Sequence, residues 1–350
     1  MKKYLIIAVM LVAFMAMPAF ASVQNVKVSG DIKATSVIRN DFGLGIGDPQ
    51  QAQATHQNVF LSQVRLRVDA DLTDNVSTTV RLLNERAWGS DVSAATDFNK
   101  NINIDLAYVQ LREMLYSPLT VTIGRQSLFY GNGFIMGNGP NNFSTGGLNA
   151  IAQDLAYPRS FDAIKGVLNY DPLTIDLFAG KVKENTATIL NSAPTNDVMI
   201  YGANANYKLS DKWNSTLEGF FFAKIDRTFA TTRDKADTVY TPGFRAETNP
   251  IKGLNVQGLL AWQMGTDNAA VLSATPGTVT QSFINAKREA MAAQLIASYL
   301  LPFEKTAKYE PVVAYAYTYT SGNRNPAASR GAQDASGERQ TAWDPMFERQ

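Results

Sequence analysis

The sequence predicts an all-β protein and, within that class, a transmembrane antiparallel up-and-down β-barrel. Three observations support this prediction. About thirteen stretches alternate apolar and polar residues, the connections between them alternate between tight turns and long polar loops, and the chain opens on an export signal. Most of the stretches run for about nine to fourteen residues, which matches the roughly 9–11 residues that a tilted strand needs to cross a bilayer. Strands of soluble proteins are typically about 5–6 residues long.

The N-terminal segment has the composition of a secretory signal. Two lysines precede an apolar run from Tyr4 to Met17, and the stretch from Pro18 to Ala21 ends in an Ala-x-Ala pattern. The apolar run is shorter than the roughly 20 residues that a transmembrane helix needs, so we expect cleavage directly after this pattern. We therefore predict a signal peptide over residues 1–21 and an outer-membrane β-barrel over residues 22–350.

The predicted strands follow one another without an amphipathic helix between them. Each is a run of alternating apolar and polar residues that ends where turn-forming or polar residues interrupt the alternation. In chain order the runs span about residues 25–38, 59–72, 75–86, 101–115, 118–130, 159–170, 173–183, 198–209, 213–225, 239–248, 253–264, 288–300 and 308–320.

The connections between these strands alternate strictly in length. Tight turns begin at Thr73, Ser117, Asp171, Ser210, Asn249 and Leu301. Long connections cover about residues 40–57, 87–100, 131–158, 184–197, 226–238, 265–287 and 321 onward. Short periplasmic turns and longer extracellular loops are typical of bacterial outer-membrane barrels, whereas a soluble sandwich mixes its loop lengths. The N-terminus then starts on the periplasmic side.

The charges within one strand indicate which face is wet. In the stretch from Val64 to Leu72 the apolar side chains point one way, and Arg65, Arg67 and Asp69 point the other. A soluble sandwich would turn the charged row to bulk water, whereas a membrane barrel turns it to a wet lumen. Later strands oppose an apolar row with a polar or small one, as a lumen requires but a dry core does not. We therefore assign the charged row to the lumen.

The composition excludes several classes of function. The chain has 32 basic and 31 acidic residues, and loss of the two N-terminal lysines leaves it one charge below neutral, which argues against a nucleic-acid partner. Cysteine is absent, so disulfides, thiolate nucleophiles and Cys-based metal sites are excluded. A single histidine, His56 in a polar loop, cannot supply a metal cluster. We expect neither an enzyme nor a cofactor; a membrane-barrel hydrolase is the remaining alternative.

The end of the chain does not complete a barrel. Thirteen strands leave the chain on the long-loop side, whereas single-chain bacterial barrels have an even number of strands. No amphipathic strand closes the sequence before Gln350, and an open edge would leave backbone groups unpaired in lipid. We therefore expect this chain to be the N-terminal part of a longer barrel.

Three stretches resemble the alginate-export family of outer-membrane proteins. They are IDLAYVQLREM at Ile104–Met114, LTVTIGRQSLFYGNGFIMG at Leu119–Gly137 and YPRSFDAIKGVLNY at Tyr157–Tyr170. The resemblance covers about residues 104–180, and WDPMF at Trp343–Phe347 is also similar to a segment of that family. It implies an eighteen-stranded barrel with an arginine-rich constriction for an anionic uronate polymer.

The candidate pore-lining residues come from two sources. Strand alternation gives Arg65, Arg67 and Arg81, together with the carboxylates Asp69 and Asp105. The structural alternative is that these arginines only pair internally, with Asp69, Asp105 or Glu85. The resemblance adds Arg125 from Gly-Arg-Gln and Arg159 from Arg-x-Phe-Asp, with Asp162 and Lys165 following in the same strand. Arg125 falls on the apolar side of its strand, so we expect a bulge at Gly124 to turn it inward. The alternative is that Arg125 snorkels to the membrane interface.

Together these features predict an outer-membrane channel for anionic solutes. Arginine suits carboxylated sugars because its planar fork meets a carboxylate with two hydrogen bonds. Passive passage of an acidic polysaccharide is the leading function, and a general diffusion porin for small anionic nutrients is the alternative. The expected partners are outer-membrane lipid, the anionic solute and periplasmic export proteins. The connection 131–158 is long enough to fold into the lumen, and extracellular exposure of that connection is equally open.

Overall fold

The computed structural model describes most of the chain. It covers residues 25–40, 56–89, 102–113, 116–137, 155, 157, 160–183, 197–227, 236–275, 278–301, 310–322 and 339–347. The predicted signal peptide, most of the long connections and Arg159 lie outside the described residues.

The described residues contain fourteen strands, thirteen of which form one continuous path. The strands are β1 (Asn25–Asn40), β2 (His56–Thr73), β3 (Val76–Ala87), β4 (Asn103–Arg112), β5 (Leu119–Gln126), β6 (Phe161–Asn169), β7 (Leu173–Lys183), β8 (Val198–Lys208), β9 (Thr216–Asp226), β10 (Asp237–Ile251), β11 (Leu254–Thr275), β12 (Thr278–Leu300), β13 (Val312–Thr320) and β14 (Arg339–Gln340).

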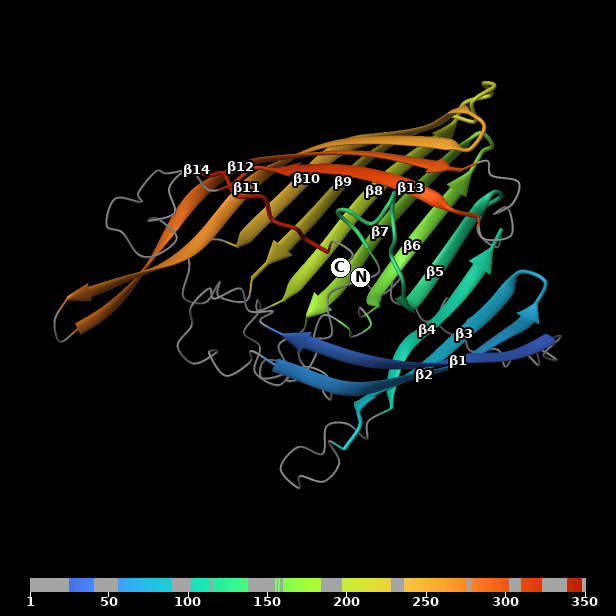
Figure 1. Cartoon of the computed structure of the whole chain (residues 1–350), viewed down its shortest axis with the longest axis horizontal. Helices are drawn as coiled ribbons and strands as arrows, with labels where there is room; N and C mark the ends of the chain where they lie inside the picture. The colour runs from blue at the N-terminus through green and yellow to red at the C-terminus, as the bar shows by residue number, and fades with distance from the viewer. Residues whose placement is uncertain are drawn as a thin grey trace, which may run out of the picture.

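The sheet has the simplest possible topology. Strands β1 to β13 are neighbours in chain order, and every consecutive pair is antiparallel. The short β14 pairs in parallel with β12. The sheet curves strongly from β1 and β2 to β12 and β13, which are its two edges within the described part of the chain (Figure 1). The predicted all-β, up-and-down arrangement is confirmed. Strand β14 was not predicted because a two-residue strand has no periodicity to detect.

One predicted loop is wrong. Residues 265–287 were expected to connect two strands, but β11 and β12 continue through them in unbroken register to the pair Thr275 and Thr278. The apolar row of β11 ends at Met264, and the sequence beyond it is polar and rich in small residues. An apolar row is required only inside the membrane, whereas hairpin pairing needs only backbone groups and extends beyond it.

Five of the six predicted tight turns lie where the sequence predicted them, and most of the connection that begins at Leu301 lies outside the described residues. The β10–β11 turn joins the pair Ile251 and Leu254 through Gly253, whose φ of +86° requires glycine. At the β6–β7 turn the Tyr170 amide donates to the Leu173 carbonyl at 2.8 Å. These turns share one end of the sheet because all the strands are antiparallel and consecutive.

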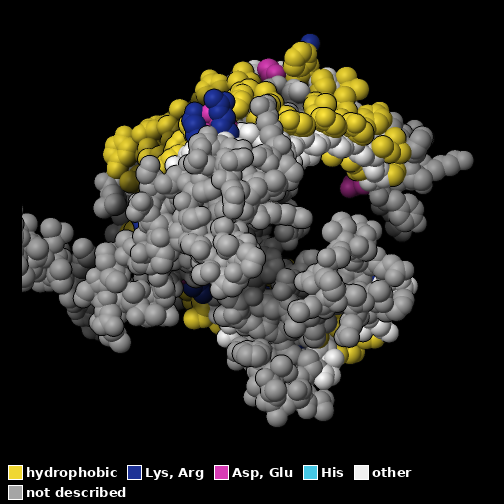
Figure 2. All heavy atoms as spheres, turned by 90° about the vertical axis from the view of Figure 1, so that its left-hand side faces the viewer, with side chains coloured by type: hydrophobic (Ala, Val, Ile, Leu, Met, Phe, Trp, Pro, Cys, Tyr) yellow, Lys and Arg dark blue, Asp and Glu magenta, His cyan; other side chains and the backbone are white. Residues whose placement is uncertain are grey.

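The two faces of the sheet have opposite polarity. Leu66, Ile164 and Leu177 are 47%, 57% and 54% exposed on the convex face, which Figure 2 shows largely covered by hydrophobic side chains. The concave face buries polar side chains instead, such as Gln63 at 2% exposure and Asn204 at 5%. Exposed apolar and buried polar side chains are the reverse of a soluble protein and match a sheet with lipid outside and a polar interior.

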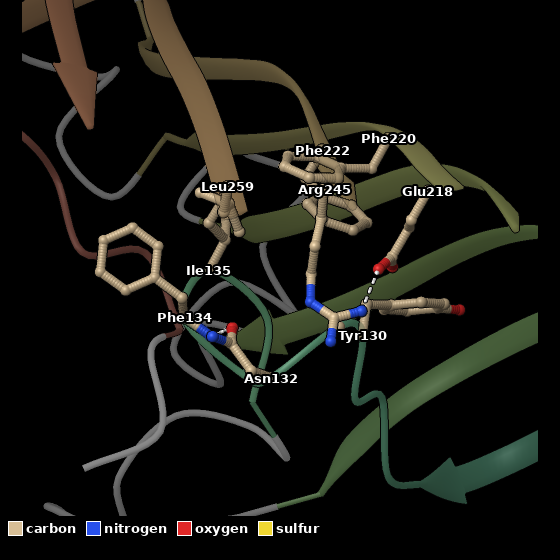
Figure 3. A pocket seen from close by; sticks show the side chains of 10 residues that line it. Tyr130, Asn132, Phe134, Ile135, Glu218, Phe220, Phe222, Arg245 and Leu259 are labelled. Carbon is tan, nitrogen blue, oxygen red and sulfur yellow. Dashed lines mark hydrogen bonds and ion pairs between the residues drawn. The ribbon is translucent and has the colours of Figure 1, made fainter. Parts of the chain in front are cut away.

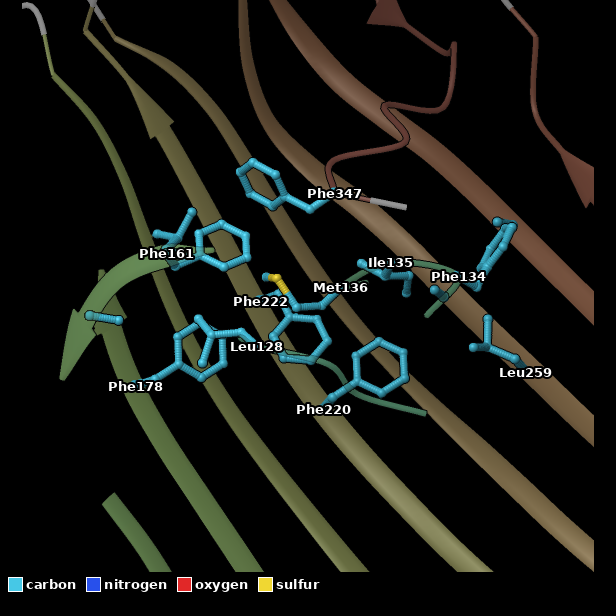
Figure 4. Close-up of a cluster of buried hydrophobic side chains, with 14 residues drawn as sticks. Leu128, Phe134, Ile135, Met136, Phe161, Phe178, Phe220, Phe222, Leu259 and Phe347 are labelled. Atoms are coloured by element: carbon cyan, nitrogen blue, oxygen red, sulfur yellow. The ribbon is translucent and has the colours of Figure 1, made fainter. Parts of the chain in front are cut away.

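The concave face also carries an apolar cluster that the sequence did not predict. Phe161, Phe178, Phe220 and Phe222 project from the wall and are buried (Figure 4). They pack against Leu128, Phe134, Ile135 and Met136 from the chain that follows β5, and against Phe347. The inward row is therefore not polar or small throughout, because it includes the apolar surface against which an internal segment packs. We call this surface the seat.

Within the described residues, the structure has no helix of sufficient length and apolar character to cross a membrane.

Candidate functional site

A hairpin-like segment that follows β5 lies against the inner wall. We call residues 127–137 the inner segment. The Tyr130 amide donates to the Met136 carbonyl at 3.0 Å, and Phe129 bridges Gly137, which closes the segment on itself. The Asn132 side chain donates to Gln294 of β12. The inner segment, whose Tyr130 also stacks on Phe178 of β7, therefore lies on the concave face over the strands β7 to β12.

The same connection also touches the opposite part of the wall. Gln63 of β2 donates its side-chain amide to the Leu155 carbonyl at 2.8 Å, and Glu85 of β3 accepts the Tyr157 amide at 2.8 Å. The Arg65 guanidinium lies 4.4 Å from the centre of the Tyr157 ring. The described parts of the β5–β6 connection thus contact β2 and β3 at one side and β9 to β12 at the other. Of the two alternatives left open by the sequence, these parts follow the inward path.

The wall formed by β1 to β4 carries a series of arginine–carboxylate pairs, which we call the arginine wall. Its three pairs are Arg65–Asp31 at 2.9 Å, Arg67–Asp69 at 2.8 Å and Arg81–Asp105 at 2.5 Å. Pairing with Asp69 and Asp105 was the structural alternative raised from the sequence. Asp31 was missed because its position opposite Arg65 depends on the β1–β2 register, which a single strand's pattern does not reveal.

The three pairs differ in their access to solvent. Arg67 and Asp69 have side-chain exposures of 38% and 31%, and those of Arg65 and Asp31 are 26% and 47%. Asp105 is only 5% exposed, and it is the residue of β4 that the β3–β4 register passes over where it shifts. The first two pairs can meet a solute in the interior, whereas the third is mainly part of the wall.

A second arginine cluster lies under the inner segment. Arg245 of β10 contacts Glu218, Glu247 and Gln257, and its side chain is 8% exposed. Figure 3 shows Arg245 and Glu218 pointing toward Tyr130 and Asn132 of the inner segment. The pocket between them measures about 10 Å³, which is room for one water and not for a sugar. The cluster therefore supports the inner segment instead of facing the route of a solute.

The inner segment packs closely against the Arg245 cluster, as the surroundings of Gly131 and the burial of Tyr130 show. A Cβ at Gly131 would approach the Arg245 Cδ to 3.1 Å and the Glu218 Oε2 to 3.2 Å. Burial of Tyr130 raises the pKa of its phenol far above the usual range, and the charge of Asp176 adds to this effect, so the hydroxyl stays neutral. The sequence signal for the segment is the apolar run Phe134–Met136 inside a polar connection.

A segment near the end of the chain holds the inner segment from the other side. We call residues 339–347 the C-terminal segment. The Phe347 amide donates to Ile135 at 3.1 Å and its carbonyl accepts from Gly137 at 2.8 Å. Gln263 of β11 exchanges two hydrogen bonds with the backbone of Asp344, at 2.7 and 2.8 Å. Lys224 of β9 completes the attachment with an ion pair to Asp344 at 2.7 Å.

Two predicted site residues lie on the outer face. Arg125 donates to both carboxylate oxygens of Asp162, at 2.9 and 2.8 Å, and these residues are direct partners in the β5–β6 register. They share the strand face of the exposed Ile123 and Ile164. The register passes Gly124 without a shift, so the predicted inward turn of Arg125 is wrong: no extra residue is present to change its side.

Two further predicted site residues remain, Lys165 and Arg159. Lys165 is opposite the buried Thr122 and therefore faces inward. Arg159 lies outside the described residues. Among the residues that the structure places, no group of three or more His, Cys, Asp or Glu side chains is arranged to hold a metal ion.

Comparisons with known proteins point to one family. The sequence model of the family described as alginate export matches residues 24–336. A comparison with curated proteins finds no match.

Among solved structures, the fold is similar to several porins. Salmonella typhi OmpF in complex with daunomycin has 10% identity and a TM-score of 0.49, over 88% of this chain and 82% of that one. Pseudomonas aeruginosa OccK9 has 11% identity and a TM-score of 0.46, over 87% and 85% of the two chains. A BenF-like porin from Pseudomonas fluorescens has 9% identity and a TM-score of 0.44, over 85% and 83%.

Proposed function

This chain belongs to the alginate export family and is an outer-membrane channel, and on that premise we propose that it passes an acidic polysaccharide by passive diffusion. The solvent-accessible arginines of the arginine wall, Arg65 and Arg67, are the proposed contacts for the sugar carboxylates. Arg81 supports them from the next strand.

The observation that carries this proposal is that each of these arginines is already paired with a carboxylate. Arg67 uses its Nε and Nη2 atoms on Asp69, at 2.8 to 3.0 Å. A sugar carboxylate would replace one acid–guanidinium contact with a similar one, at little net gain in free energy. A channel needs binding of this kind, since a solute that binds tightly cannot leave.

The local charge around Asp69 favours an anion. Lys27 is its direct partner in β1, Arg67 lies two residues away, and Arg81 is the direct partner of Arg67 in β3. Lys27, Arg67 and Arg81 thus lie around Asp69, and the second carboxylate of this group is Asp105, the partner of Arg81. Rings and rows of cations lower the cost of passing an anion through a narrow wet channel.

One observation favours the alternative of a porin for small anions. The described ends of the β5–β6 connection lie against the inner wall at two distant places, near Gln63 and near Gln294, and they narrow the interior there. A constriction of this kind suits small solutes better than a polymer, unless the polymer passes as a single extended chain.

The test is electrical recording of the full chain in a planar bilayer under a salt gradient. The reversal potential reports the charge preference, and current block by added oligouronate reports the solute class. Replacement of Arg65 and Arg67 by glutamine leaves Asp31 and Asp69 without their arginine partners, so we expect the preference to move from anions to cations. The oligouronate concentration for half block should rise roughly ten-fold, as expected for the loss of two exposed ion pairs.

Arg125→Gln is the matched control, because Arg125 is paired with a carboxylate on the outer face and should change neither reading. Anion preference with block by small carboxylates alone would favour the small-anion porin. A cation-selective wild-type channel that ignores oligouronate would refute the polysaccharide proposal.

A further inference from the structure

We propose that the outer face of β11, β12 and β13 binds one phosphate-bearing lipid of the outer leaflet. The phosphate would lie at Lys287 and Arg339, and an acyl chain would fill a groove lower on the same strands. The site lies on the opposite side of the wall from the channel and is independent of the solute that the channel carries.

The headgroup end of the site is a cluster with an excess of positive charge. Lys287 and Glu289 of β12 lie on the exposed face of the strand, and Arg339 of β14 is the direct partner of Lys287. Both cations contact the same carboxylate, with Lys287 Nζ at 2.5 Å from Glu289 and Arg339 Nη1 at 2.8 Å. Their side chains are 69% and 67% exposed. Two accessible cations with one acid leave one positive charge for an incoming phosphate.

The acyl end of the site is an apolar groove. It measures about 350 Å³ and is lined on its outer side by Phe244, Leu260, Ala293, Leu295 and Tyr317. Phe244, Leu260, Leu295 and Tyr317 are between 37% and 54% exposed. This part of the sheet faces the membrane, so the groove can be filled only by hydrocarbon or by another protein.

The two ends lie along one line on the sheet. Glu289 is the register partner of Met264, and Ala293 is the register partner of Leu260. Four residues of a strand separate them, which is roughly 13 Å. The exposed Trp262 and Met291, which are register partners, lie between them. The charged cluster is therefore at the extracellular end of the apolar band, and the groove is deeper in it, in the order of a headgroup and its chain.

The charge balance distinguishes this cluster from another ionic group on the outer face. Arg125 is matched one to one by Asp162, which binds it through both oxygens. Figure 2 shows the convex face as mostly hydrophobic, with a small group of basic side chains around an acidic one. Only a net positive cluster attracts an anionic headgroup, so the lipid is expected at Lys287 and Arg339.

The experiment is native mass spectrometry of the delipidated full chain in detergent, titrated with phosphatidylglycerol, with zwitterionic phosphatidylcholine and with inorganic phosphate. Wild type should retain one phosphatidylglycerol more tightly than phosphatidylcholine, and free phosphate should not replace it. The double variant Lys287→Gln/Arg339→Gln should bind phosphatidylglycerol roughly 25-fold more weakly, at about five-fold for each cation near a lipid surface.

Two further variants separate lipid binding from a loss of structure. Glu289→Gln removes the acid that the two cations share, so it should tighten phosphatidylglycerol binding about five-fold, whereas a purely structural cluster would be weakened. Ala293→Phe fills the groove and should weaken both lipids. Lys181→Gln, an outward-facing cation on β7, is the control and should change neither.

Equal binding of phosphatidylglycerol by wild type and the double variant would overturn the proposal, and so would weaker binding by Glu289→Gln. A second copy of the chain in place of lipid would assign the groove to a protein interface. Channel recordings on the same variants should be unchanged, so failure here is separable from failure of the proposed channel function.

Discussion

Lys224 and Asp344 are 120 residues apart in the chain and form an ion pair on the inner face of the sheet. Both side chains are less than one-fifth exposed. The pair joins the C-terminal segment to β9, and the C-terminal segment in turn holds the inner segment. The first predictions concern this attachment.

Replacement of Lys224 by methionine should loosen the C-terminal segment. The variant leaves the Asp344 carboxylate largely buried without its cation, at a cost of about 1–3 kcal/mol. We expect faster proteolysis within residues 339–347 and a lower unfolding temperature in detergent. Lys181→Met removes a cation from a more exposed pair, with Asp197 on the other side of the wall, and should have little effect on either measurement; equal effects of the two substitutions would contradict the role of the Lys224–Asp344 pair.

The same attachment should weaken in acid. Burial pushes the pKa of Asp344 upward, but the charge and hydrogen bond of Lys224 outweigh it and hold the pKa below its usual value. A lowered pKa in the folded state contributes stability above the unfolded value of about 4, and this contribution is lost as the pH falls through the folded pKa. As the pH falls below about 4, wild type should therefore approach the protease sensitivity of Asp344→Asn and reach it only below the lowered folded pKa, while the variant should show a smaller change. A parallel response of both proteins would contradict this assignment.

Arg67 and Arg81 are direct cross-strand partners, yet their replacement should have different effects. Arg81→Gln leaves Asp105, which is 5% exposed, as a buried charge without its partner, and should cost about 3–5 kcal/mol. Arg67→Gln breaks a solvent-exposed pair worth about 0–1 kcal/mol and should act mainly on ion preference. Urea or thermal unfolding in detergent measures the first effect and bilayer recording the second. Equal destabilisation by the two changes would show that exposure does not separate the pairs.

Phe134→Ala should release the inner segment from its seat. Phe134 is 5% exposed and its ring lies 6.1 Å from that of Trp343; truncation of a buried phenylalanine costs about 3–5 kcal/mol. We expect higher single-channel conductance with larger current noise. Phe244→Ala, which truncates an exposed ring on the outer face, should leave the conductance unchanged. Lower or equal conductance in Phe134→Ala would mean that the segment does not narrow the channel.

Gly124→Ala should destabilise the protein more than Gly219→Ala. Gly124 has a φ of +122°, and a Cβ there would collide with the Ala107 carbonyl and lie 2.9 Å from the Tyr108 Cα. At Gly219 a Cβ would meet nothing within 4 Å. A backbone strained at positive φ costs about 1–3 kcal/mol, so the unfolding temperature in detergent should fall for Gly124→Ala alone. Similar temperatures for both variants would contradict this view of Gly124.

The sequence predicted the wall well because lipid enforces one apolar row on each strand. That row defines the two faces of β2 from Val64 to Leu72 and the limits of β7 at Leu173 and Lys183. The prediction failed where the membrane imposes nothing, as in residues 265–287, where pairing continues beyond the bilayer. Arg125 was placed on the wrong face because the family resemblance was preferred to the apolar–polar alternation of its strand. The alternation put Arg125 on the apolar, outward face, where the structure has it.

The interior could not be predicted in the same way. The inner segment packs on side chains from β7 to β12, and Asp344 meets Lys224 only because the chain returns to the sheet. These contacts depend on register and on long-range packing, which a local pattern does not contain. The apolar run Phe134–Met136 was the available signal, since three apolar residues in succession within a polar loop need a surface to cover them.

The seat of the inner segment also sets the order in which this molecule can assemble. Asn132 contacts Gln294, which is 162 residues later in the chain, and the seat includes Phe220 and Leu259. A chain that has formed only β1 to β8 has a wall but not that surface. Contacts so distant in sequence form late because closing a long loop is costly in entropy. The channel is therefore built open first, and its constriction is added when the last strands of the seat arrive.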